Sequence, residues 1–274
     1  MTEYINTLFN LENKIAVITG GSGVLGSEMA QGLLQAGAKV ILLATNEQNL
    51  KQKVNKLSEF GVVRGYKCNV LNEDNIKSAY ANILDEFKQI DILINAAGGH
   101  VPGAIIGLDQ SIFDLNIQDF KAVTDLNLNG TILPTLIFGK TMAEKKSGSI
   151  INISSMATQR AITRAVGYSA AKAAVENFTR WMAVELAQKF GNGIRVNAIA
   201  PGFFLTDQNR EILTNKDGSL TERGETIINI TPFKRFGEPN ELIGTILWLA
   251  SDAAKFVTGT IIPIDGGFSA FSGV

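Results

Sequence analysis

The sequence predicts one α/β domain, a doubly wound, Rossmann-type sheet of about seven parallel strands with helices on both faces. Two observations support this fold class. Short apolar runs recur along the chain, and longer stretches with helical spacing separate them. Strands that are apolar throughout are buried on both faces, as in a parallel sheet covered by helices. Strict alternation of such strands with helices is typical of a doubly wound sheet.

The expected strands are short and apolar. They comprise Ile15–Thr19, Val40–Leu43, a weaker run that opens with Val62 and Val63, Ile92–Ile94, Ser149–Ile153, Ile194–Ile199 and Ile261–Ile264. The crossover helices are expected at Leu25–Gln35, Asn72–Phe87, Gln118–Ala143, Tyr168–Phe190 and Asn240–Leu249. Gly37 follows the first of these helices and is a typical helix stop.

We expect residues 1–274 to form a single domain, because no linker, low-complexity segment or further repeat divides the chain. The stretch 203–231 departs from the alternation. It is long, polar in its middle and lies between two expected strands. Excursions of this length in a compact domain are usually binding loops, so we expect a substrate lid here.

Composition and charge exclude several classes of protein. The net charge is −1 and no long run of Lys and Arg occurs, which argues against a nucleic-acid partner. The single cysteine, Cys68, cannot form an internal disulfide, and with one histidine it cannot build a zinc site, so no metal is expected. Neither a signal-peptide pattern nor an apolar run of about 18 residues is present, and we expect a cytoplasmic protein that does not meet the membrane.

A glycine-rich loop, Thr19–Gly26, joins the first expected strand to the first helix. Glycines let the backbone turn sharply and approach a pyrophosphate, and a helix N-terminus offers free N–H groups with partial positive charge. Such a loop is often only a turn. Its place at the first strand–helix junction favours dinucleotide binding.

Tyr168 and Lys172 lie four residues apart and would share one face of a helix. A tyrosine hydroxyl has an ordinary pKa of about 10, and a nearby ammonium favours its phenolate. The pair alone is a weak signal, because such pairs occur by chance on many helices. Ser155 precedes Tyr168 by thirteen positions, and Asn127 lies further upstream. The four together, behind a dinucleotide loop, indicate a proton-transfer centre.

These residues resemble the motifs of the short-chain dehydrogenases/reductases. The matching features are the Thr19–Gly26 loop, Asn95–Gly98 after the fourth strand, Asn127, Ser155, Tyr168, Lys172, Pro201–Gly202 after the sixth strand and Asp265–Gly267 near the C-terminus. They span essentially the whole chain in the order and spacing of the family. One position departs: Val24 stands where the family usually has Gly or Ala, with the middle glycine at Gly23. This shift, with Gly98–Ala104, Pro201–Arg210 and the tail Asp265–Val274, resembles the D-mannonate oxidoreductase (fructuronate reductase) branch.

The resemblance implies a role for each of the four side chains. Tyr168 would be the general acid in reduction and the base in oxidation, and Lys172 would lower its pKa and hold the nicotinamide ribose. Ser155 would hydrogen-bond the substrate oxygen, and Asn127 would position a water that links Lys172 to solvent. Hydride arriving at a carbonyl carbon develops negative charge on oxygen, to which Ser155 and Tyr168 can both donate.

The implied cofactor is NAD or NADP. Contacts with it are expected from Gly20, Ser22, Gly23, Val24, Leu25, Gly26, Thr45, Asn46, Asn69, Val70, Asn95, Ala96, Ala97, Gly98, Tyr168, Lys172, Pro201, Gly202, Phe204 and Thr206. The preference stays open, because the second strand ends in Ala44-Thr45-Asn46, with neither the acid typical of NAD sites nor the arginine typical of NADP sites. Asn69 also stands where the family commonly has an aspartate beside the adenine.

A sugar-acid substrate carries a carboxylate, so its pocket needs cations or a cluster of donors. Arg160 and Arg164 lie between Ser155 and Tyr168, and Arg210 lies at the start of the expected lid. Each of the three could equally be a solvated surface residue. His100 and Asn209 suit a polyhydroxylated ligand, and they equally suit ordinary loops.

The most specific expectation is an NAD(P)-dependent oxidoreductase that interconverts D-mannonate and D-fructuronate. Two alternatives remain: the same chemistry on another sugar acid such as gluconate and 5-ketogluconate, or on a ketose or polyol, and a nucleotide-binding regulator without turnover. The resemblance also implies a homo-oligomer, a dimer or a tetramer, assembled through the helices at Gln118–Ala143 and Tyr168–Phe190.

Overall fold

Seven parallel strands form one sheet in the computed structural model, which describes residues 2–207 and 209–273. They are β1 (Ile15–Thr19), β2 (Lys39–Ala44), β3 (Val63–Lys67), β4 (Ile92–Asn95), β5 (Gly148–Ile153), β6 (Ile194–Pro201) and β7 (Ile261–Ile264). Their spatial order is β3-β2-β1-β4-β5-β6-β7, so the direction of winding reverses between β1 and β4. Ligands bind outside the carboxyl ends of the strands at such a reversal. The predicted doubly wound sheet is confirmed.

Burial explains why the apolar runs become strands. Every residue of β1, β4 and β6 is buried, as expected of strands covered on both faces. The edge strand β3 is different, because only its first residue, Val63, is buried. That exposure accounts for the weak sequence signal at the third strand.

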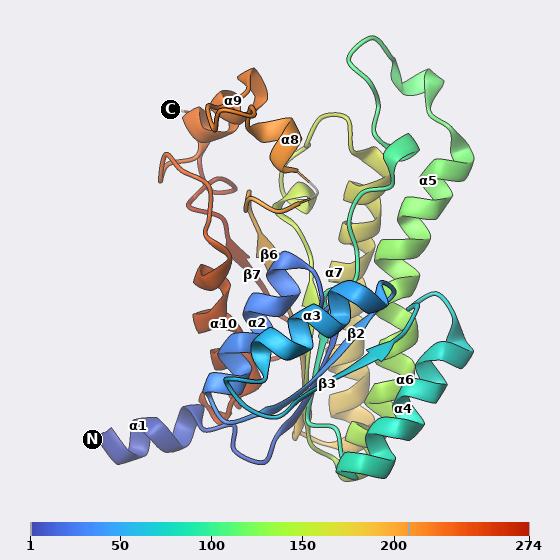
Figure 1. Cartoon of the computed structure of the whole chain (residues 1–274), viewed down its shortest axis with the longest axis vertical. Helices are drawn as coiled ribbons and strands as arrows, with labels where there is room; N and C mark the ends of the chain where they lie inside the picture. Colours follow the sequence, from blue (N-terminus) through green and yellow to red (C-terminus); the bar gives the residue numbers. More distant parts are fainter. Residues whose placement is uncertain (1, 208, 274) are drawn as a thin grey trace.

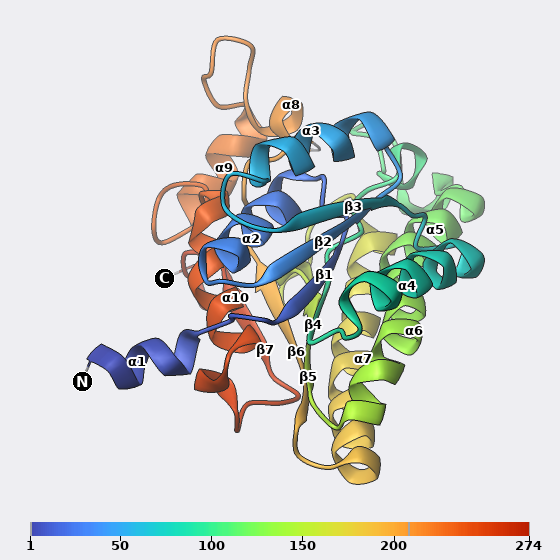
Figure 2. The ribbon, with the colours of Figure 1, turned by 60° about the horizontal axis from the view of Figure 1, so that its bottom comes forward.

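Helices cover the sheet on both sides (Figure 2). The longer ones are α2 (Val24–Gln35), α3 (Glu47–Leu57), α4 (Glu73–Phe87), α6 (Gly130–Lys145), α7 (Val166–Phe190) and α10 (Ile243–Ala250). On one face, Met29 of α2, Leu50 of α3 and Ile246 of α10 share a core with the strands. On the other face, Phe138 of α6 and Met182 of α7 pack in a second core, together with residues of α4.

The predicted helix Gln118–Ala143 is interrupted in the structure. It consists of α5 (Ile117–Thr124) and α6, joined by a π-helical turn at Asp125–Asn129. Single π turns inside helices are frequent at functional sites. This one carries Asn127, whose side chain it places in the interior.

In the described residues, four α-helices lie outside the expected set: α1 (Thr2–Phe9), α3, α8 (Arg210–Leu213) and α9 (Glu222–Ile230). α3 gives a weak sequence signal because it is polar, with only Leu50 and Leu57 buried. α1 projects from the body of the protein at the N-terminus (Figure 1).

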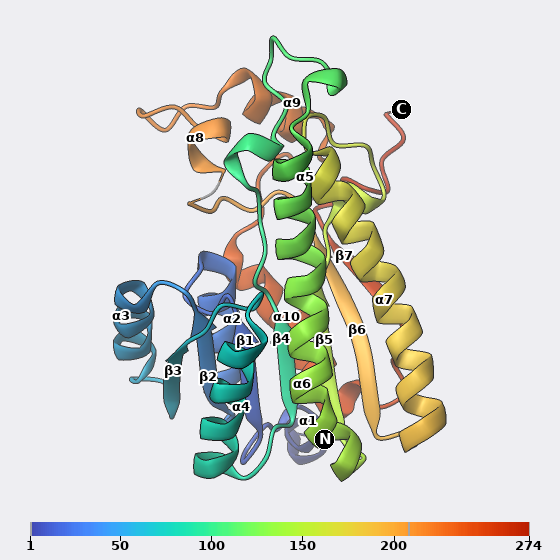
Figure 3. The ribbon, with the colours of Figure 1, turned by 90° about the vertical axis from the view of Figure 1, so that its right-hand side faces the viewer.

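The segment 203–231 contains α8 and α9 and lies beyond the carboxyl ends of the strands (Figures 1 and 3). The chain between β4 and α5 crosses the same end of the sheet and includes two short 3₁₀ turns, Pro102–Ala104 and Ile112–Asp114. Among the described residues, no helix has the length and apolarity needed to cross a bilayer.

Candidate active site

Ser155, Tyr168 and Lys172 come together at the carboxyl end of β5 and the start of α7. Tyr168 and Lys172 lie one turn apart on α7, with Lys172 Nζ 5.6 Å from the centre of the Tyr168 ring. Ser155 begins the 3₁₀ turn Met156–Thr158 that follows β5, and its Oγ accepts the N–H of Ala157 at 3.1 Å. Ser155 and Tyr168 line the same cavity, and the Ser155 hydroxyl acts to lower the pKa of the Tyr168 phenol. The structure therefore brings the three predicted groups into one site.

Burial controls the charge state of this group. It raises the pKa of the Tyr168 phenol, and the Ser155 hydroxyl opposes that rise. Burial also lowers the pKa of Lys172 to about 8, because the ammonium loses hydration. Lys172 was expected to lower the pKa of Tyr168; in this structure the pKa is raised, and the opposing group is Ser155. Lys172 Nζ instead donates to the carbonyl of Ile153 at 2.7 Å.

Asn127 fixes the loop that follows β4. Its side-chain Nδ2 donates to the carbonyl of Gly99 at 2.8 Å, and its Oδ1 accepts the N–H of Gly99 at 3.0 Å. A Cβ atom on Gly98 would lie 2.7 Å from Asn127 Oδ1 and 3.3 Å from Lys172 Nζ. Gly98 is therefore the spacer that lets Asn127 and Lys172 approach the same stretch of backbone. The water assigned to Asn127 by resemblance stays a prediction.

Glu176, which sequence reasoning missed, ties Ser155 to α7. Its Oε1 accepts the hydroxyls of Ser154 at 2.9 Å and Thr158 at 2.5 Å, the residues that bracket Ser155. Glu176 is buried and lies one turn beyond Lys172 on α7. The carboxylate thus joins the turn that carries Ser155 to the helix that carries Tyr168. Only its spacing from Lys172 could have signalled it.

The glycine loop has the shape that a dinucleotide pyrophosphate requires. Gly20 adopts a φ of 65°, and a Cβ there would lie 2.8 Å from Ala96 O, so only glycine fits. A Cβ on Gly26 would lie 2.5 Å from Gly20 O. Gly23 is the N-cap of α2 and makes no side-chain cap, which leaves N–H groups of the first turn free for a phosphate. The residues present therefore fit NAD or NADP, which would also meet Ser22, Val24 and Leu25 at the start of α2.

The loops that follow β1 and β4 are linked by Thr19, whose Oγ1 accepts the N–H groups of Ala96 and Ala97, both at 3.1 Å. This link holds the predicted Asn95–Gly98 turn beside the glycine loop. The side chain of Asn95 itself points into the interior and donates to Thr135 and Asn152. Asn95 can thus reach a cofactor only through its backbone.

Residues expected around the adenosine lie at the ends of β2 and β3. Thr45 is exposed, and Asn46 Oδ1 is occupied as the N-cap of α3, where it accepts the Asn49 N–H at 3.0 Å. Asn69 is exposed, whereas Val70 is buried. No acidic or basic side chain is contributed by these four, so the structure leaves the preference between NAD and NADP open.

The remaining cofactor candidates follow β6. Gly202 donates its N–H to Ile264 O at 2.9 Å, and a Cβ there would lie 2.7 Å from Asp265. The Phe204 side chain is buried beside Gly237, and its contact with a cofactor stays a prediction. Thr206 donates its N–H to Asn209 Oδ1 at 2.8 Å, so this pair shapes the loop after Pro201.

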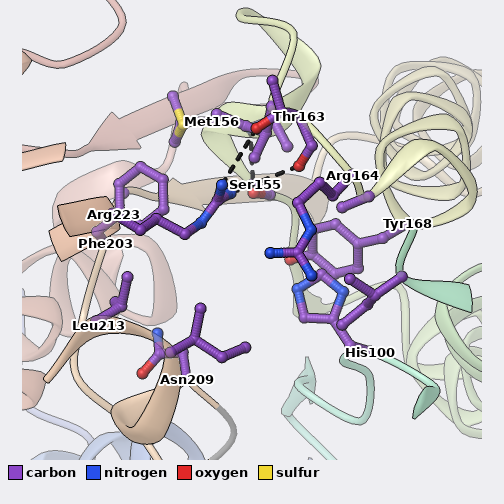
Figure 4. A pocket seen from close by; sticks show the side chains of 16 residues that line it. His100, Ser155, Met156, Thr163, Arg164, Tyr168, Phe203, Asn209, Leu213 and Arg223 are labelled. Carbon is purple, nitrogen blue, oxygen red and sulfur yellow. Dashed lines mark hydrogen bonds between the residues drawn. The ribbon is translucent and has the colours of Figure 1, made fainter. Parts of the chain in front are cut away.

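A cavity of about 170 Å³ opens next to Tyr168 and Ser155 (Figure 4). Its walls come from the loop after β4, the turn after β5, the start of α7 and the segment 203–231. The lining residues are His100, Ile105, Ser155, Met156, Ala157, Ile162, Thr163, Arg164, Ala165, Tyr168, Gly202, Phe203, Asn209, Ile212, Leu213 and Arg223. In the described part of the chain, no group of three or more His, Cys, Asp or Glu side chains could hold a metal.

The His100 ring packs against the ring of Tyr168. The two ring centres are 4.6 Å apart, with the planes tilted by 41°. Burial, followed by the charges of Lys172 and Arg223, lowers the pKa of His100. Its imidazole is therefore neutral near pH 7 and can exchange hydrogen bonds with a hydroxyl group without adding charge.

The predicted arginines divide into two groups. Arg164 lines the cavity, whereas Arg160 and Arg210 do not. Arg160 donates to the carbonyls of Ser269 and Phe271 and so fastens the C-terminal tail, and Arg210 is exposed on α8. Arg223, in the first turn of α9, lines the cavity and was missed. Its position within the polar stretch 203–231 was the only available signal.

Asn209 lines the cavity, but its side chain is largely used within its own loop. Its Nδ2 donates to Phe204 O at 2.8 Å, and its Oδ1 accepts the Thr206 N–H. Asn209 therefore shapes the wall of the cavity rather than presenting a free amide.

Comparison with known proteins places these features in a family. A family model described as enoyl-(acyl carrier protein) reductase matches residues 22–269. The uncharacterized oxidoreductase UxuB of Bacillus subtilis is 45% identical over 278 residues, which cover 97% of this chain and 98% of that one. A 2-dehydro-3-deoxy-D-gluconate 5-dehydrogenase of Formosa agariphila is 35% identical over 268 residues, which cover 97% of this chain and 96% of that one.

Solved structures show the same likeness. A crystal structure of a candidate D-mannonate oxidoreductase from Haemophilus influenzae, with bound NAD, has a TM-score of 0.91 and 41% identity, and the match covers 98% of this chain and 100% of that one. A Pseudomonas aeruginosa RhlG complex holds NADP; its TM-score is 0.85 at 28% identity, covering 96% of this chain and 99% of that one. Solved structures similar to this chain thus hold either nucleotide.

Proposed function

Because this chain belongs to the short-chain dehydrogenases/reductases, a family of NAD(P)-dependent oxidoreductases, we propose that it interconverts a secondary alcohol and a ketone of a sugar acid. The proposed pair is D-mannonate and D-fructuronate. The observation that carries the proposal is the meeting of Ser155, Tyr168 and Lys172 beside a cavity that contains two arginines. The descriptions of two similar proteins, a candidate D-mannonate oxidoreductase and a dehydrogenase of a deoxygluconate, support a sugar-acid substrate.

The proposed mechanism divides the work between cofactor and side chains. The nicotinamide, when bound, supplies or accepts the hydride. Tyr168 gives its hydroxyl proton to the substrate oxygen in reduction and takes it back in oxidation. Ser155 donates a hydrogen bond to the same oxygen, which stabilises the negative charge that develops there. Lys172, with its pKa lowered to about 8, is able to exchange a proton near neutral pH and can restore the Tyr168 proton.

The walls of the cavity favour a charged ligand over an acyl chain. An acyl substrate would suit Ile105, Ile162 and Leu213, but it would leave the charges of Arg164 and Arg223 without a partner. Uncompensated charges out of water are costly. A polyhydroxylated acid gives the arginines a carboxylate and gives His100 a hydroxyl group.

The test is a panel of four carbonyl compounds, fructuronate, tagaturonate, 5-ketogluconate and fructose, each with NADH and with NADPH. We expect oxidation of the nucleotide, followed by its absorbance, to be fastest with fructuronate. The Tyr168→Phe variant should lose turnover by about 10²–10⁴-fold, while nucleotide binding, followed by fluorescence, is retained. A regulator without turnover would bind NADH yet oxidise it with none of the four.

We also propose a homo-oligomer assembled through α6 and α7. Both helices carry large apolar side chains in solvent, with Leu136 of α6 56% exposed and Trp181 of α7 59% exposed. Sedimentation should give a dimer or tetramer, and Trp181→Glu should shift it toward the monomer. An unchanged sedimentation coefficient in that variant would exclude this face.

A further inference from the structure

Two arginines line the cavity from separate segments, and a neighbouring segment hydrogen-bonds part of each guanidinium. Arg164 lies in the loop before α7; its Nε donates to Ile106 O at 2.6 Å, and the Ile106 N–H donates back to Arg164 O at 3.0 Å. Arg223 lies in the first turn of α9, and its Nη1 donates to Thr163 Oγ1 at 3.2 Å. Figure 4 shows Arg164 with His100 and Tyr168, and Arg223 reaching toward Thr163.

The backbone of Arg164 is in an unusual conformation. Its φ is 74°, in the left-handed region that non-glycine residues seldom adopt. Such conformations persist only where the surroundings enforce them, and they cluster at functional sites. The paired hydrogen bonds with Ile106 enforce this one, and they leave the two Nη groups of Arg164 without a hydrogen-bond partner among residues 2–207 and 209–273.

The two charges are not compensated within the cavity. Its described lining contains no Asp or Glu, and neither arginine belongs to an ion pair with any residue that the structure describes. Burial and the nearby charge of Arg164 lower the pKa of Arg223, but a guanidinium stays protonated at neutral pH. Since His100 is neutral, the excess positive charge of this wall comes from the two arginines. An anion placed between them would relieve both their repulsion and their incomplete solvation.

We propose that Arg164 and Arg223 together bind the carboxylate of the substrate, an inference that rests on the proposed function. A guanidinium presents its N–H groups in a planar fork that matches a carboxylate. Arg164 is fixed by the loop after β4, whereas Arg223 arrives with α9 in the segment 203–231. A carboxylate bound by both therefore joins that segment to the loop before α7. The carboxylate end of the substrate is fixed in this way while Ser155 and Tyr168 hold the oxygen at the reacting carbon.

The experiment uses two substrates that differ only at the carboxylate. D-Fructuronate and D-fructose carry a carboxylate and a hydroxymethyl group at the same end, so their ratio of kcat/KM isolates carboxylate recognition. Arg164→Met and Arg223→Met should each lower kcat/KM for fructuronate at least tenfold, mainly through KM, and leave kcat/KM for fructose within about threefold. Arg223→Lys should recover part of the loss, because it keeps the charge but not the fork.

Arg210→Met is the matched control. It removes one positive charge from the same segment, but at an exposed residue outside the cavity lining, so the ratio should be unchanged. Equal losses on both substrates in the Arg164 and Arg223 variants would overturn the proposal. An equal effect of Arg210→Met would overturn it too, since it would reveal a long-range electrostatic effect rather than a contact.

A binding measurement separates this proposal from the proposed function. Titration calorimetry of D-mannonate and D-mannitol into enzyme saturated with NADH should show at least tenfold tighter binding of mannonate, lost in Arg223→Met. If that holds but fructuronate is not reduced, the carboxylate site stands and the proposed substrate fails. Suppose instead that fructuronate is reduced, and that the Arg164→Met and Arg223→Met variants keep both the preference for fructuronate over fructose and the tighter binding of mannonate over mannitol. The carboxylate site then fails and the proposed function stands. If fructuronate is not reduced and mannonate binds no more tightly than mannitol, both the proposed function and the carboxylate site are rejected.

Discussion

Replacing Glu176 by alanine tests whether this buried carboxylate holds the reaction centre together. Glu176 accepts the Ser154 hydroxyl at 2.9 Å and the Thr158 hydroxyl at 2.5 Å, and it is 8% exposed. A hydrogen bond to a charged group contributes about 1.5–3 kcal/mol. Thr158 keeps a second acceptor, Ser155 O at 2.9 Å. We therefore expect the free energy of unfolding to fall by about 2–4 kcal/mol.

The effect on turnover should exceed what loss of stability alone produces. Without Glu176 the turn that carries Ser155 loses its tie to α7, and small misplacements of reacting groups cost up to about 10²-fold in rate. We expect kcat to fall between about tenfold and a hundredfold, with the Kd of the nucleotide little changed. Because the Ser155 hydroxyl opposes the raised pKa of Tyr168, its displacement should also move the pH profile of alcohol oxidation to higher pH.

The assay combines urea unfolding, followed by tryptophan fluorescence, with initial rates at saturating nucleotide. Arg180→Ala is the control, because it removes the partner at 3.3 Å from Glu176 Oε2 while both hydroxyl contacts remain. Arg180 is 54% exposed, so its loss should cost at most about 1 kcal/mol. Glu176→Gln retains an oxygen acceptor, so its unfolding free energy and its kcat should lie between those of Glu176→Ala and Arg180→Ala. A Glu176→Ala enzyme with a wild-type pH profile and kcat would refute the reasoning.

Two further predictions concern Lys172 and Gly98. The pKa of Lys172 is lowered from 10.5 to about 8 in the folded enzyme, so between those values the unfolded chain binds more protons and stability rises with pH. In that window, the difference in unfolding free energy between the cofactor-free enzyme and its Lys172→Met variant should rise by at most about 1.4 kcal/mol per pH unit. A difference that does not change with pH would contradict the lowered pKa of Lys172. Gly98→Ala should abolish most turnover, since its Cβ would lie 2.7 Å from Asn127 Oδ1. Gly244→Ala, where nothing lies within 4 Å and the helix should gain about 0.5–1 kcal/mol, should keep full turnover and a higher melting temperature.

The fold was predictable because its signals are local. β1 and β6 are buried along their whole length, and apart from Thr19 in β1 and Arg195 and Asn197 in β6 their residues are apolar. β3 and α3 lie at the edge of the sheet and bury few residues, which is why the strand signal was weak and the helix was missed. The break in the helix at Asp125–Asn129 was also missed, because a π turn leaves the apolar pattern on either side intact.

The site was predictable only where function depends on residues close in sequence. Tyr168 and Lys172 are one helical turn apart, so helical geometry alone places them together. The arginines are different, because the contacts that decide their roles join segments far apart in the chain. Arg160 gives its donors to the tail carbonyls of Ser269 and Phe271. Among the residues that the structure describes, Arg223 hydrogen-bonds Thr163, sixty positions away. Arg160 and Arg210 were expected at the site because they lie near Ser155 and the start of the lid in the sequence. The sequence does not reveal how many of their N–H groups tertiary contacts leave for a ligand. That count is what separates a binding arginine from a structural one in this cavity.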